Sequence, residues 1–158
     1  MKLSIAYMKS PVGFIRLSGL EMALMNLEFT EDRGNDESEP EKLQLAMKQL
    51  DEYFLGSREV FDLPLHPVGT HFQLNVWEKL QTIPYGKTLC YEDVARSLGD
   101  IKVIRAAATA NGKNPLPIII PCHRVISKNG TLGGYSGGLW RKKWLLDFEQ
   151  KDSRPRLL

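Results

Sequence analysis

The sequence predicts an α/β fold of the α+β kind, in which a small amino-terminal antiparallel sheet with one helix precedes a mostly helical domain of the winged helix-turn-helix type. Residues 1–30 alternate apolar and polar side chains as strands do, and the later part of the chain shows helical spacing with capping residues. A proline-containing joint at 63–69 separates the two parts. The chain has 158 residues, 42% hydrophobic and 25% charged, so it can bury a core without disulfides or a metal.

The predicted domain boundaries follow this joint. Residues 1–64 form an amino-terminal scaffold domain, residues 65–69 a linker and residues 70–158 a second domain. Residues 1–64 hold 7 basic and 12 acidic residues, a net charge of −5, whereas residues 65–158 hold 14 and 7, a net charge of +7. This asymmetry indicates that the second domain meets a polyanion and that the first faces away from it.

The first domain is expected to begin with a three-strand meander. Apolar side chains alternate through three short segments, with breaks at Ser10 and Pro11 and again at Ser18 and Gly19. Such a meander would give the domain a single antiparallel sheet with one face to bury.

A helix should cover that face. The segment 31–41 contains six acidic residues among eleven and is expected to be a solvated loop. Ser38 and Glu41 have the spacing of a capping box, and the chain then runs at helical spacing up to Gly56. The apolar positions of this helix are Leu43, Ala46, Met47, Leu50, Tyr53 and Phe54.

The second domain opens with a capped helix and continues with a helical pair. Thr70 and Gln73 again have capping-box spacing, and the helix they begin should end before Pro84. A short helix over 91–99 ends at a glycine, and a second helix follows over 101–110. Two short helices joined by a tight glycine turn are typical of a helix-turn-helix, although such pairs also occur in plain protein cores.

The second helix of this pair is unusual in composition. Arg105 stands among small residues, whereas a helix that reads bases in the major groove usually displays several long polar side chains. The small side chains are equally consistent with two arrangements. The helix could pack tightly against another helix, or it could lie in a shallow groove with one arginine inserted.

The remaining segments are predicted as a strand, a wing and a final helix. The β-branched run 118–120 should be a buried strand, and residues 125–127 and 131–132 should form a hairpin around Asn129 and Gly130. A glycine-rich loop over 133–138 leads into a helix over 139–149. We expect Trp144, Leu145 and Phe148 to face inward on this helix, and Arg141, Lys142 and Lys143 to face outward.

The start of the chain lacks a signal-peptide core, and no segment approaches the apolar length that a membrane span needs. We therefore expect a cytoplasmic protein with no membrane partner, in which Cys90 and Cys122 are free thiols. For Cys90, a partly buried small residue at a helix start is the simplest interpretation.

Cys122 is the residue most suited to chemistry. It follows a predicted buried strand and Pro121, and a thiol needs a base or a positive environment to react at neutral pH. Because neighbouring residues do not face each other, His123 would have to act through a water, with Glu149 available to orient its ring. The alternative interpretation of this pair is a buried structural thiol beside a surface histidine.

A longer motif surrounds these residues. Pro121-Cys122-His123-Arg124-Val125 is preceded by Asn114-Pro115 and followed by Gly134-Tyr135-Ser136-Gly137-Gly138-Leu139 and by Trp144-Leu145-Leu146. This sequence resembles the O6-alkylguanine-DNA alkyltransferases, or methylated-DNA–protein-cysteine methyltransferases, closely over about residues 70–150 and weakly before them. The Asn111-Gly112 pair is most like the bacterial constitutive branch of that family.

The resemblance implies DNA repair by direct damage reversal. An alkyl group would pass irreversibly from O6-alkylguanine, or from O4-methylthymine, in duplex DNA to Cys122. His123 would deprotonate the thiol through a water, Glu149 would orient the imidazole, and Tyr91 would donate a proton to the departing guanine. The thioether product is stable, so each molecule should react once and no cofactor is expected.

The resemblance also implies how the lesion is reached. Arg105 would fill the base stack after the target nucleotide has flipped out through the minor groove. Further DNA contacts are expected from Lys102, Ala106, Thr109, Asn111, Arg124 and Lys128, and Lys113, Arg141 and Lys142 are additional candidates for phosphate. The expected substrate contacts are Asn114 at a bracing turn, the carbonyls of Cys122 and Val125, and the loop residues Tyr135, Ser136 and Gly137. The expected partner is double-stranded DNA with O6-alkylguanine, bound by a monomer.

Vertebrate members of the family hold a structural zinc through cysteines and histidines of the amino-terminal domain. Here no cysteine precedes Cys90, and His66, His71 and His123 are too few and wrongly spaced. We therefore expect no metal.

Three other functions compete with this interpretation. A non-catalytic lesion-binding protein of the alkyltransferase-like kind would lack the reactive cysteine that stands at Cys122. A winged-helix regulator would need base-reading side chains where this chain has alanines. A cysteine peptidase would need its histidine far from the cysteine in sequence.

Overall fold

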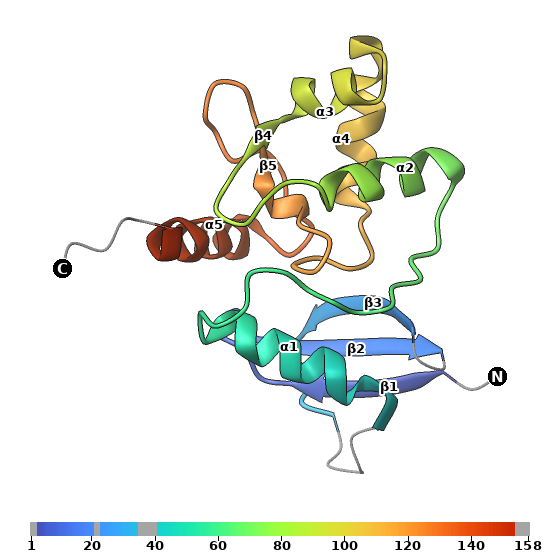
Figure 1. Ribbon diagram of the computed structural model, residues 1–158, viewed down its shortest axis with the longest axis vertical. Helices are drawn as coiled ribbons and strands as arrows, with labels where there is room; N and C mark the ends of the chain where they lie inside the picture. The colour runs from blue at the N-terminus through green and yellow to red at the C-terminus, as the bar shows by residue number, and fades with distance from the viewer. Residues whose placement is uncertain (1–2, 21–22, 35–40, 154–158) are drawn as a thin grey trace. The chain divides into compact units, whose positions relative to one another are not determined.

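The computed structural model describes residues 3–20, 23–34 and 41–153, and the chain divides into two compact units, Met1–Val68 and Gly69–Leu158. The division falls inside the segment 65–69 that was expected to be a linker. Figure 1 shows the first unit as a sheet with one helix, and the second unit as a group of helices with long connecting segments. Among the described residues, no helix is both long and apolar enough to cross a membrane.

The first unit is the predicted meander. Strands β1 (Ser4–Met8), β2 (Phe14–Leu20) and β3 (Ala23–Thr30) form an antiparallel sheet in that order. The expected break at Ser18 and Gly19 is wrong, because β2 continues through both residues with a register shift between them. Gly19 is required there, since a Cβ on it would lie 2.2 Å from the carbonyl oxygen of Ala23.

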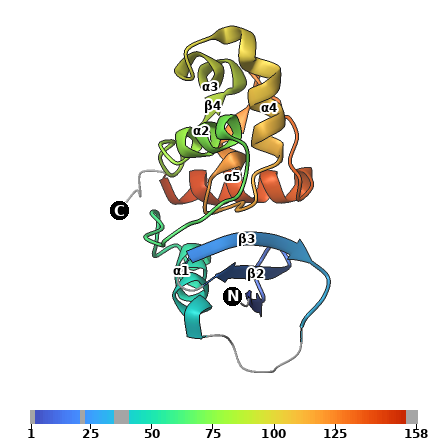
Figure 2. The ribbon, with the colours of Figure 1, turned by 90° about the vertical axis from the view of Figure 1, so that its right-hand side faces the viewer.

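One helix covers the sheet of the first unit. The 3₁₀ turn η1 (Glu41–Leu43) leads into α1 (Gln44–Phe54), which lies across one face of the sheet (Figure 2). The apolar positions predicted for this helix, of which Leu43 belongs to η1 and the others to α1, are buried, except Phe54, which is partly exposed. Ser38 lies outside the described residues, and α1 itself begins after Leu43 with no capping side chain.

The segment that follows α1 is fixed to the edge of this sheet. The Leu24 amide donates to the Pro64 carbonyl at 2.9 Å, and the His66 amide donates to the Leu24 carbonyl at 2.8 Å. Leu65 thereby forms an isolated parallel bridge with Leu24 in β3. Part of the expected linker therefore belongs to the first unit.

The second unit opens with the capped helix that the sequence predicts. Helix α2 (His71–Leu80) starts at Thr70, whose hydroxyl accepts from the Gln73 amide at 3.1 Å while the Gln73 side chain accepts from the Thr70 amide at 2.9 Å. The Trp77 indole donates to the Ala110 carbonyl at 2.8 Å and so joins α2 to α4 (Ile104–Gly112).

The expected helical pair is also present. Helix α3 (Tyr91–Ser97) ends before Gly99, whose φ of 102° is a conformation that glycine adopts without strain. The 3₁₀ turn η2 (Ile101–Val103) and α4 (Ile104–Gly112) follow, and Figure 2 shows α3 and α4 beside each other. Ala95, Ala107 and Ala110 are buried, which allows the two helices to pack closely.

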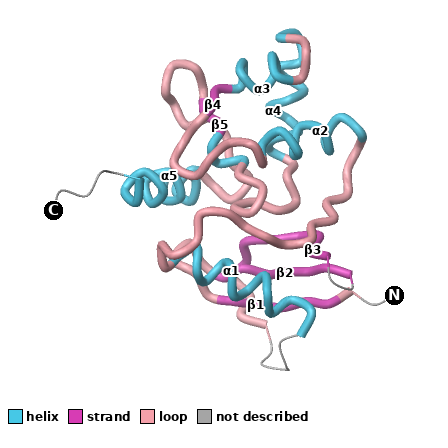
Figure 3. Tube along the Cα trace, viewed as in Figure 1, coloured by secondary structure: helices cyan, strands magenta, loops and turns pink. Residues whose placement is uncertain are grey.

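Long irregular segments connect α4 to the last helix, as Figure 3 shows. The predicted strand over 118–120 is wrong: these isoleucines are buried in a turn, where the Ile120 amide donates to the Leu116 carbonyl at 2.8 Å. Pro115, Pro117 and Pro121 withhold the amides that a strand ladder would use.

The predicted two-strand wing is replaced by a different pairing. The Ser127 amide donates to the Thr131 carbonyl at 3.0 Å, which closes the turn, but residues 131–132 form no strand. Instead β5 (Val125–Ile126) pairs in parallel with β4 (Leu89–Cys90), which immediately precedes α3. Helix α5 (Leu139–Ser153) completes the unit.

Candidate active site

Cys122 lies at the start of the 3₁₀ turn η3 (Cys122–Arg124), not at a strand end. Asn114 braces the chain before it, because its Nδ2 donates to the Ile120 carbonyl at 2.7 Å and its Oδ1 accepts from the Leu116 amide at 2.9 Å. Ile118, inside this braced turn, has a φ of 75°, a costly conformation for a β-branched residue. The bracing by Asn114 therefore holds the backbone in a shape it would not adopt alone.

The Cys122 thiol is buried, with 3% of the residue exposed. Burial raises its pKa to about 11, while a hydrogen bond from Asn114 and the positive charge of Lys142 act in the opposite direction. The resting residue is therefore a protonated thiol at neutral pH, and it needs a base before it can act as a nucleophile.

A candidate base follows directly. His123 is fully buried, and its Nε2 lies 2.7 Å from Oε2 of Glu149 in α5. Burial lowers the pKa of His123 and outweighs the opposite effect of Glu149, so the ring is neutral at neutral pH. Because Glu149 is ionised, Nε2 carries the proton and donates it to the carboxylate, which leaves Nδ1 as an acceptor. The ring can therefore take up a proton at Nδ1.

Glu149 is held by several donors at once. Arg124 Nε donates to Oε1 at 2.8 Å, Arg124 Nη2 donates to Oε2 at 3.0 Å, and the Gly86 amide donates to Oε1 at 3.3 Å. Burial alone would raise the pKa of Glu149, but the hydrogen bonds and charges of His123 and Arg124 hold it well below its ordinary range. The carboxylate stays charged and fixes the orientation of the imidazole.

Arg124 thus has a different place from the one predicted. Only 6% of the residue is exposed, and its remaining donor, Nη1, is 2.7 Å from the Ile83 carbonyl. This position contradicts the expected DNA contact, because the guanidinium is enclosed with Glu149. The pairing supplies the counter-charge that a buried carboxylate needs.

Lys142 also differs from expectation. The sequence places it on the outer face of the last helix, yet it is fully buried, and its Nζ donates to the Val125 carbonyl at 2.7 Å and to the Gly134 carbonyl at 3.1 Å. Burial lowers its pKa to about 8. The prediction of an outward phosphate contact is wrong because this amine joins the segment after Cys122 to the glycine-rich loop.

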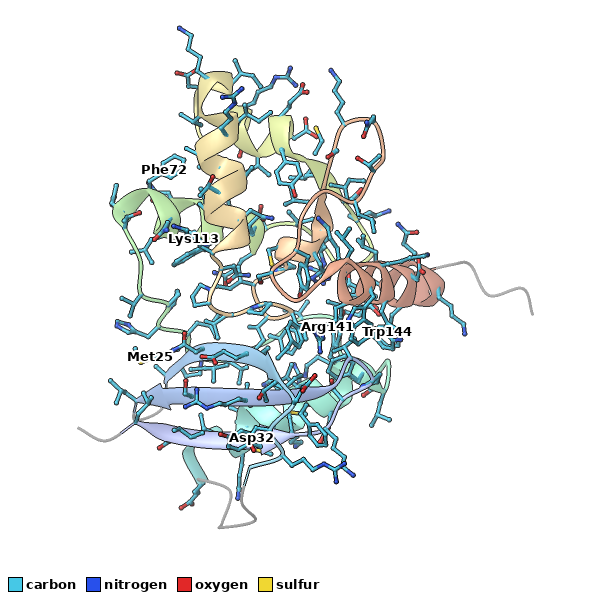
Figure 4. All side chains as sticks on the ribbon, turned by 180° about the vertical axis from the view of Figure 1, so that it is seen from behind. Met25, Asp32, Phe72, Lys113, Arg141 and Trp144 are labelled. Carbon is cyan, nitrogen blue, oxygen red and sulfur yellow. The ribbon has the colours of Figure 1, made fainter. Side chains whose placement is uncertain are left out.

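The other side chains of α5 lie as follows. Leu145 is buried, Lys143 is exposed and paired with Asp147, and Trp144 stacks on Phe148 with ring centroids 5.0 Å apart. Figure 4 shows the side chains of Arg141 and Trp144 extending from this helix. Arg141 is half-buried and donates to the Gly137 carbonyl at 2.8 Å, so it supports the loop.

The glycine-rich loop lies against Tyr91. A Cβ on Gly133 would be 2.7 Å from the Tyr91 hydroxyl, and that hydroxyl bonds to the backbone of Gly134. Burial raises the pKa of Tyr91, so the phenol keeps its proton at neutral pH. In the same loop, Tyr135 is half-buried and Ser136 is exposed. The loop therefore brings Tyr91, Tyr135 and Ser136 into one region with Lys142.

Helix α4 divides the predicted DNA contacts between two faces. Arg105, Ala106 and Thr109 are exposed, as is Lys102 in η2. Asn111 is buried, with 4% exposed, and its Nδ2 donates to the Cys122 carbonyl at 3.4 Å. That burial contradicts the expected DNA contact of Asn111, because its side chain points toward the thiol segment.

Two more lysines that were predicted to contact DNA, Lys128 and Lys113, are exposed. Lys128 is exposed and lies 3.4 Å from Glu92 of α3. Lys113 is exposed directly after α4 (Figure 4).

Helical spacing offered a signal for the missed position of Lys142. Lys142, Leu145 and Glu149 are separated by three and four residues and share one face of α5. A helix that turns Leu145 and Glu149 inward must also turn Lys142 inward. Asn111 shows the same kind of spacing, because it follows the buried Ala107 by four residues in α4. The burial of Arg124 had no such signal, because Arg124 lies in the short turn η3.

The whole chain is similar to known proteins. Residues 3–67 match the family described as "6-O-methylguanine DNA methyltransferase, ribonuclease-like domain", and residues 71–151 match its DNA binding domain. A methylated-DNA–protein-cysteine methyltransferase of Methanosarcina barkeri is 43% identical over 92% of this chain and 96% of its own length. The constitutive enzyme of Bacillus subtilis is 45% identical over 75% of this chain and 72% of its own length.

Solved structures agree with these sequence matches. The Mycobacterium tuberculosis O6-methylguanine methyltransferase has a TM-score of 0.88 at 38% identity, covering 98% of this chain and 97% of that one. A structure of the M. tuberculosis protein in complex with DNA has a TM-score of 0.84 at 41% identity, covering 92% of each chain.

Proposed function

Because the chain belongs to the methylated-DNA–protein-cysteine methyltransferase family, it repairs DNA by transferring an alkyl group to a protein cysteine, and we propose that Cys122 is that cysteine. One observation supports this choice best: His123 and Arg124, the two residues that follow Cys122, are buried and both bond to the carboxylate of Glu149. Cys90, the other thiol, is partly exposed at the start of α3, where its backbone amide donates to the exposed side chain of Asp93 at 3.3 Å.

The first step is the activation of the thiol. The Sγ proton of Cys122 passes through a water to Nδ1 of His123, which creates a thiolate and an imidazolium. Glu149 accepts from Nε2 throughout, so its negative charge stabilises the imidazolium as it forms. Lys142 contributes a second positive charge that favours the thiolate.

The second step is the displacement. The thiolate attacks the alkyl carbon, a sulfur–carbon bond forms, and the carbon–O6 bond breaks with its electron pair going to the guanine. Tyr91 donates its phenolic proton to the guanine ring and so neutralises the leaving group. Tyr91 then regains a proton from solvent, His123 releases one, and Cys122 remains as a thioether. No step regenerates the thiol, so the protein reacts once.

DNA is the partner of this family, and we propose that the substrate is O6-alkylguanine in a duplex. A relative of 41% identity has been solved with DNA, and the exposed face of α4 supplies the residue types that suit a minor groove, with Arg105 beside Ala106. Arg105 would occupy the stack that the flipped nucleotide leaves. Ser136, Gly137 and the carbonyls of Cys122 and Val125 would contact the flipped base.

The experiment that tests this function uses a duplex with one O6-methylguanine. We expect incubation with the protein to convert the lesion to guanine with an upper limit of one guanine per protein molecule, measured by nucleoside analysis of the digested DNA. The matched control is Cys122→Ser, which should bind the duplex and restore no guanine. Multiple turnovers, or full repair by Cys122→Ser, would contradict the proposal.

The alternative of a lesion-binding protein without chemistry is not favoured by the relatives, whose names state methyltransferase activity. The same experiment separates the two, because such a protein would retain the duplex and leave the methyl group on the base.

A further inference from the structure

Two buried polar atoms near Cys122 have no hydrogen-bond partner within the described part of the chain: Oδ1 of Asn111 and Nδ1 of His123. Asn111 is 4% exposed and His123 is fully buried. The Asn111 side chain reaches the backbone next to His123, since its Nδ2 donates to the carbonyl of Cys122, the residue that precedes His123. Buried polar atoms in native proteins are usually satisfied, by water where protein groups do not reach them.

Both of these atoms are acceptors. The Asn111 amide is oriented by its Nδ2, which faces the Cys122 carbonyl, so the other atom is the carbonyl oxygen. The His123 ring donates through Nε2 to the ionised Glu149, so Nδ1 presents a lone pair. Two acceptors cannot bond to each other, but a water can donate one hydrogen to each.

We propose that Asn111 is a positioning residue, whose Oδ1 holds the water that carries the proton from Cys122 to His123. This inference rests on the proposed function, in which that proton transfer activates the thiol. The water would donate to Asn111 Oδ1 and to His123 Nδ1, and its oxygen would accept from the Cys122 thiol. Every hydrogen and one lone pair of the water are then used.

This arrangement explains how the water stays aligned during the transfer. As the Sγ proton moves to the water oxygen, the hydrogen on the Nδ1 side moves to His123, and the hydrogen on Asn111 is not involved. Asn111 therefore prevents the water from rotating, and the same amide holds the backbone of Cys122 through Nδ2. The helix that presents Arg105 on its exposed face thus contributes to the thiol's activation from its buried face.

The test compares Asn111→Leu with Asn111→Asp, using free O6-benzylguanine as the probe so that DNA contacts of α4 do not enter. Leucine has a similar size and removes both the acceptor and the donor, whereas aspartate keeps an acceptor and loses the amide donor. The second-order rate of Cys122 alkylation is measured by mass spectrometry. We expect Asn111→Leu to react about tenfold more slowly than the wild type. Asn111→Asp should be slowed less, by about threefold, because its carboxylate keeps the acceptor although its negative charge opposes the thiolate.

Each outcome has a defined meaning. If both variants are slowed equally, the Nδ2 contact to the Cys122 carbonyl is what matters, and the inference is wrong; it is also wrong if Asn111→Leu reacts at the wild-type rate. Thermal unfolding checks that the variants are folded, and should Asn111→Leu not fold, a high-resolution crystal structure of the wild type decides. A water within hydrogen-bond distance of Asn111 Oδ1 and His123 Nδ1 supports the inference, and its absence there refutes it. Failure of the wild type to alkylate Cys122 would instead refute the proposed function.

Discussion

Glu149→Gln should destabilise the second unit strongly, because one carboxylate accepts from four donors, three of which are buried. Oε1 accepts from Arg124 Nε and the Gly86 amide, and Oε2 accepts from Arg124 Nη2 and His123 Nε2. Glutamine keeps the shape but places an NH₂ group at one of these oxygens. Whichever way the amide turns, two donors then face a donor, and the Arg124 guanidinium loses its counter-charge.

The expected cost follows from this burial. Glu149 is 1% exposed and Arg124 6%, so the ion pair is almost fully removed from solvent. Removing one partner of such a pair costs about 3–5 kcal/mol of the free energy of unfolding. Urea unfolding followed by tryptophan fluorescence measures this directly, since Trp77, Trp140 and Trp144 all belong to the second unit.

The matched control is Asp147→Asn on the same helix. Asp147 pairs with Lys143 at 2.7 Å, but the two side chains are 62% and 66% exposed. An exposed pair contributes at most about 1 kcal/mol, so the control should unfold nearly as the wild type does. If Glu149→Gln were as stable as Asp147→Asn, the buried contacts of Glu149 with His123 and Arg124 would not stabilise the second unit.

The pH dependence of the unfolding free energy is an independent test of the charge on Glu149. The pKa of Glu149 is held well below its ordinary value of 4.5, so its stabilising effect is complete above pH 4.5 and is lost as the pH falls toward the folded-state pKa. The difference in unfolding free energy between wild type and Glu149→Gln should therefore shrink as the pH falls below about 4.5. A difference that grows in that range would contradict the ionised state assigned to Glu149.

Three further variants test other parts of the site. Arg105→Ala should react with free O6-benzylguanine at close to the wild-type rate and repair a duplex about tenfold more slowly or worse, since nucleotide flipping costs a few kcal/mol; equal losses on both substrates would exclude the role in the base stack. Lys142→Met should lower the unfolding free energy by about 2–3 kcal/mol at pH 7, because the Val125 and Gly134 carbonyls lose their donor. Burial lowers the pKa of Lys142 from its ordinary value of 10.5 to about 8, so this lysine should contribute a gain in unfolding free energy as the pH rises from about 8 to about 10. Urea titrations at about pH 8 and about pH 10 should show that Lys142→Met lacks this contribution. Tyr91→Phe should bind the duplex normally and transfer the methyl group about a hundredfold more slowly in single-turnover assays, and an unchanged rate would remove the phenol from the proton path.

The sequence predicted the elements whose signals are local and repeated. The alternating residues before Thr30, the capping box at Thr70 and Gln73, and the glycine turn at Gly99 each correspond to a feature of the structure. Such signals depend on residues that are neighbours in the chain, so contacts with distant segments do not change them.

The errors arose where tertiary contacts outweigh local pattern. Residues 118–120 have the β-branched character of a strand, but the nearby prolines and the two hydrogen bonds of Asn114 hold them in a turn. The hairpin at Asn129 and Gly130 closes its turn, yet β5 finds its partner in β4, which lies far before it in the chain.

In the candidate site too, the local motif was predictable and the tertiary contacts were not. The motif pointed to Cys122, His123 and Glu149, and the structure places the last two in contact. Arg124 was expected to contact DNA, and Lys142 was expected to face outward on the last helix. Their burial depends on a carboxylate or carbonyls contributed by other segments, which composition does not reveal.

A peptide mass map identifies the residue that receives the alkyl group, which we propose to be Cys122. After incubation with a duplex that contains one O6-methylguanine, the protein is digested and the masses of the peptides with Cys122 and Cys90 are compared. We predict that the Cys122 peptide gains the mass of one CH₂ group, in proportion to the guanine restored, while the Cys90 peptide is unchanged. An unmodified Cys122 peptide after the lesion has been repaired would exclude Cys122 as the acceptor.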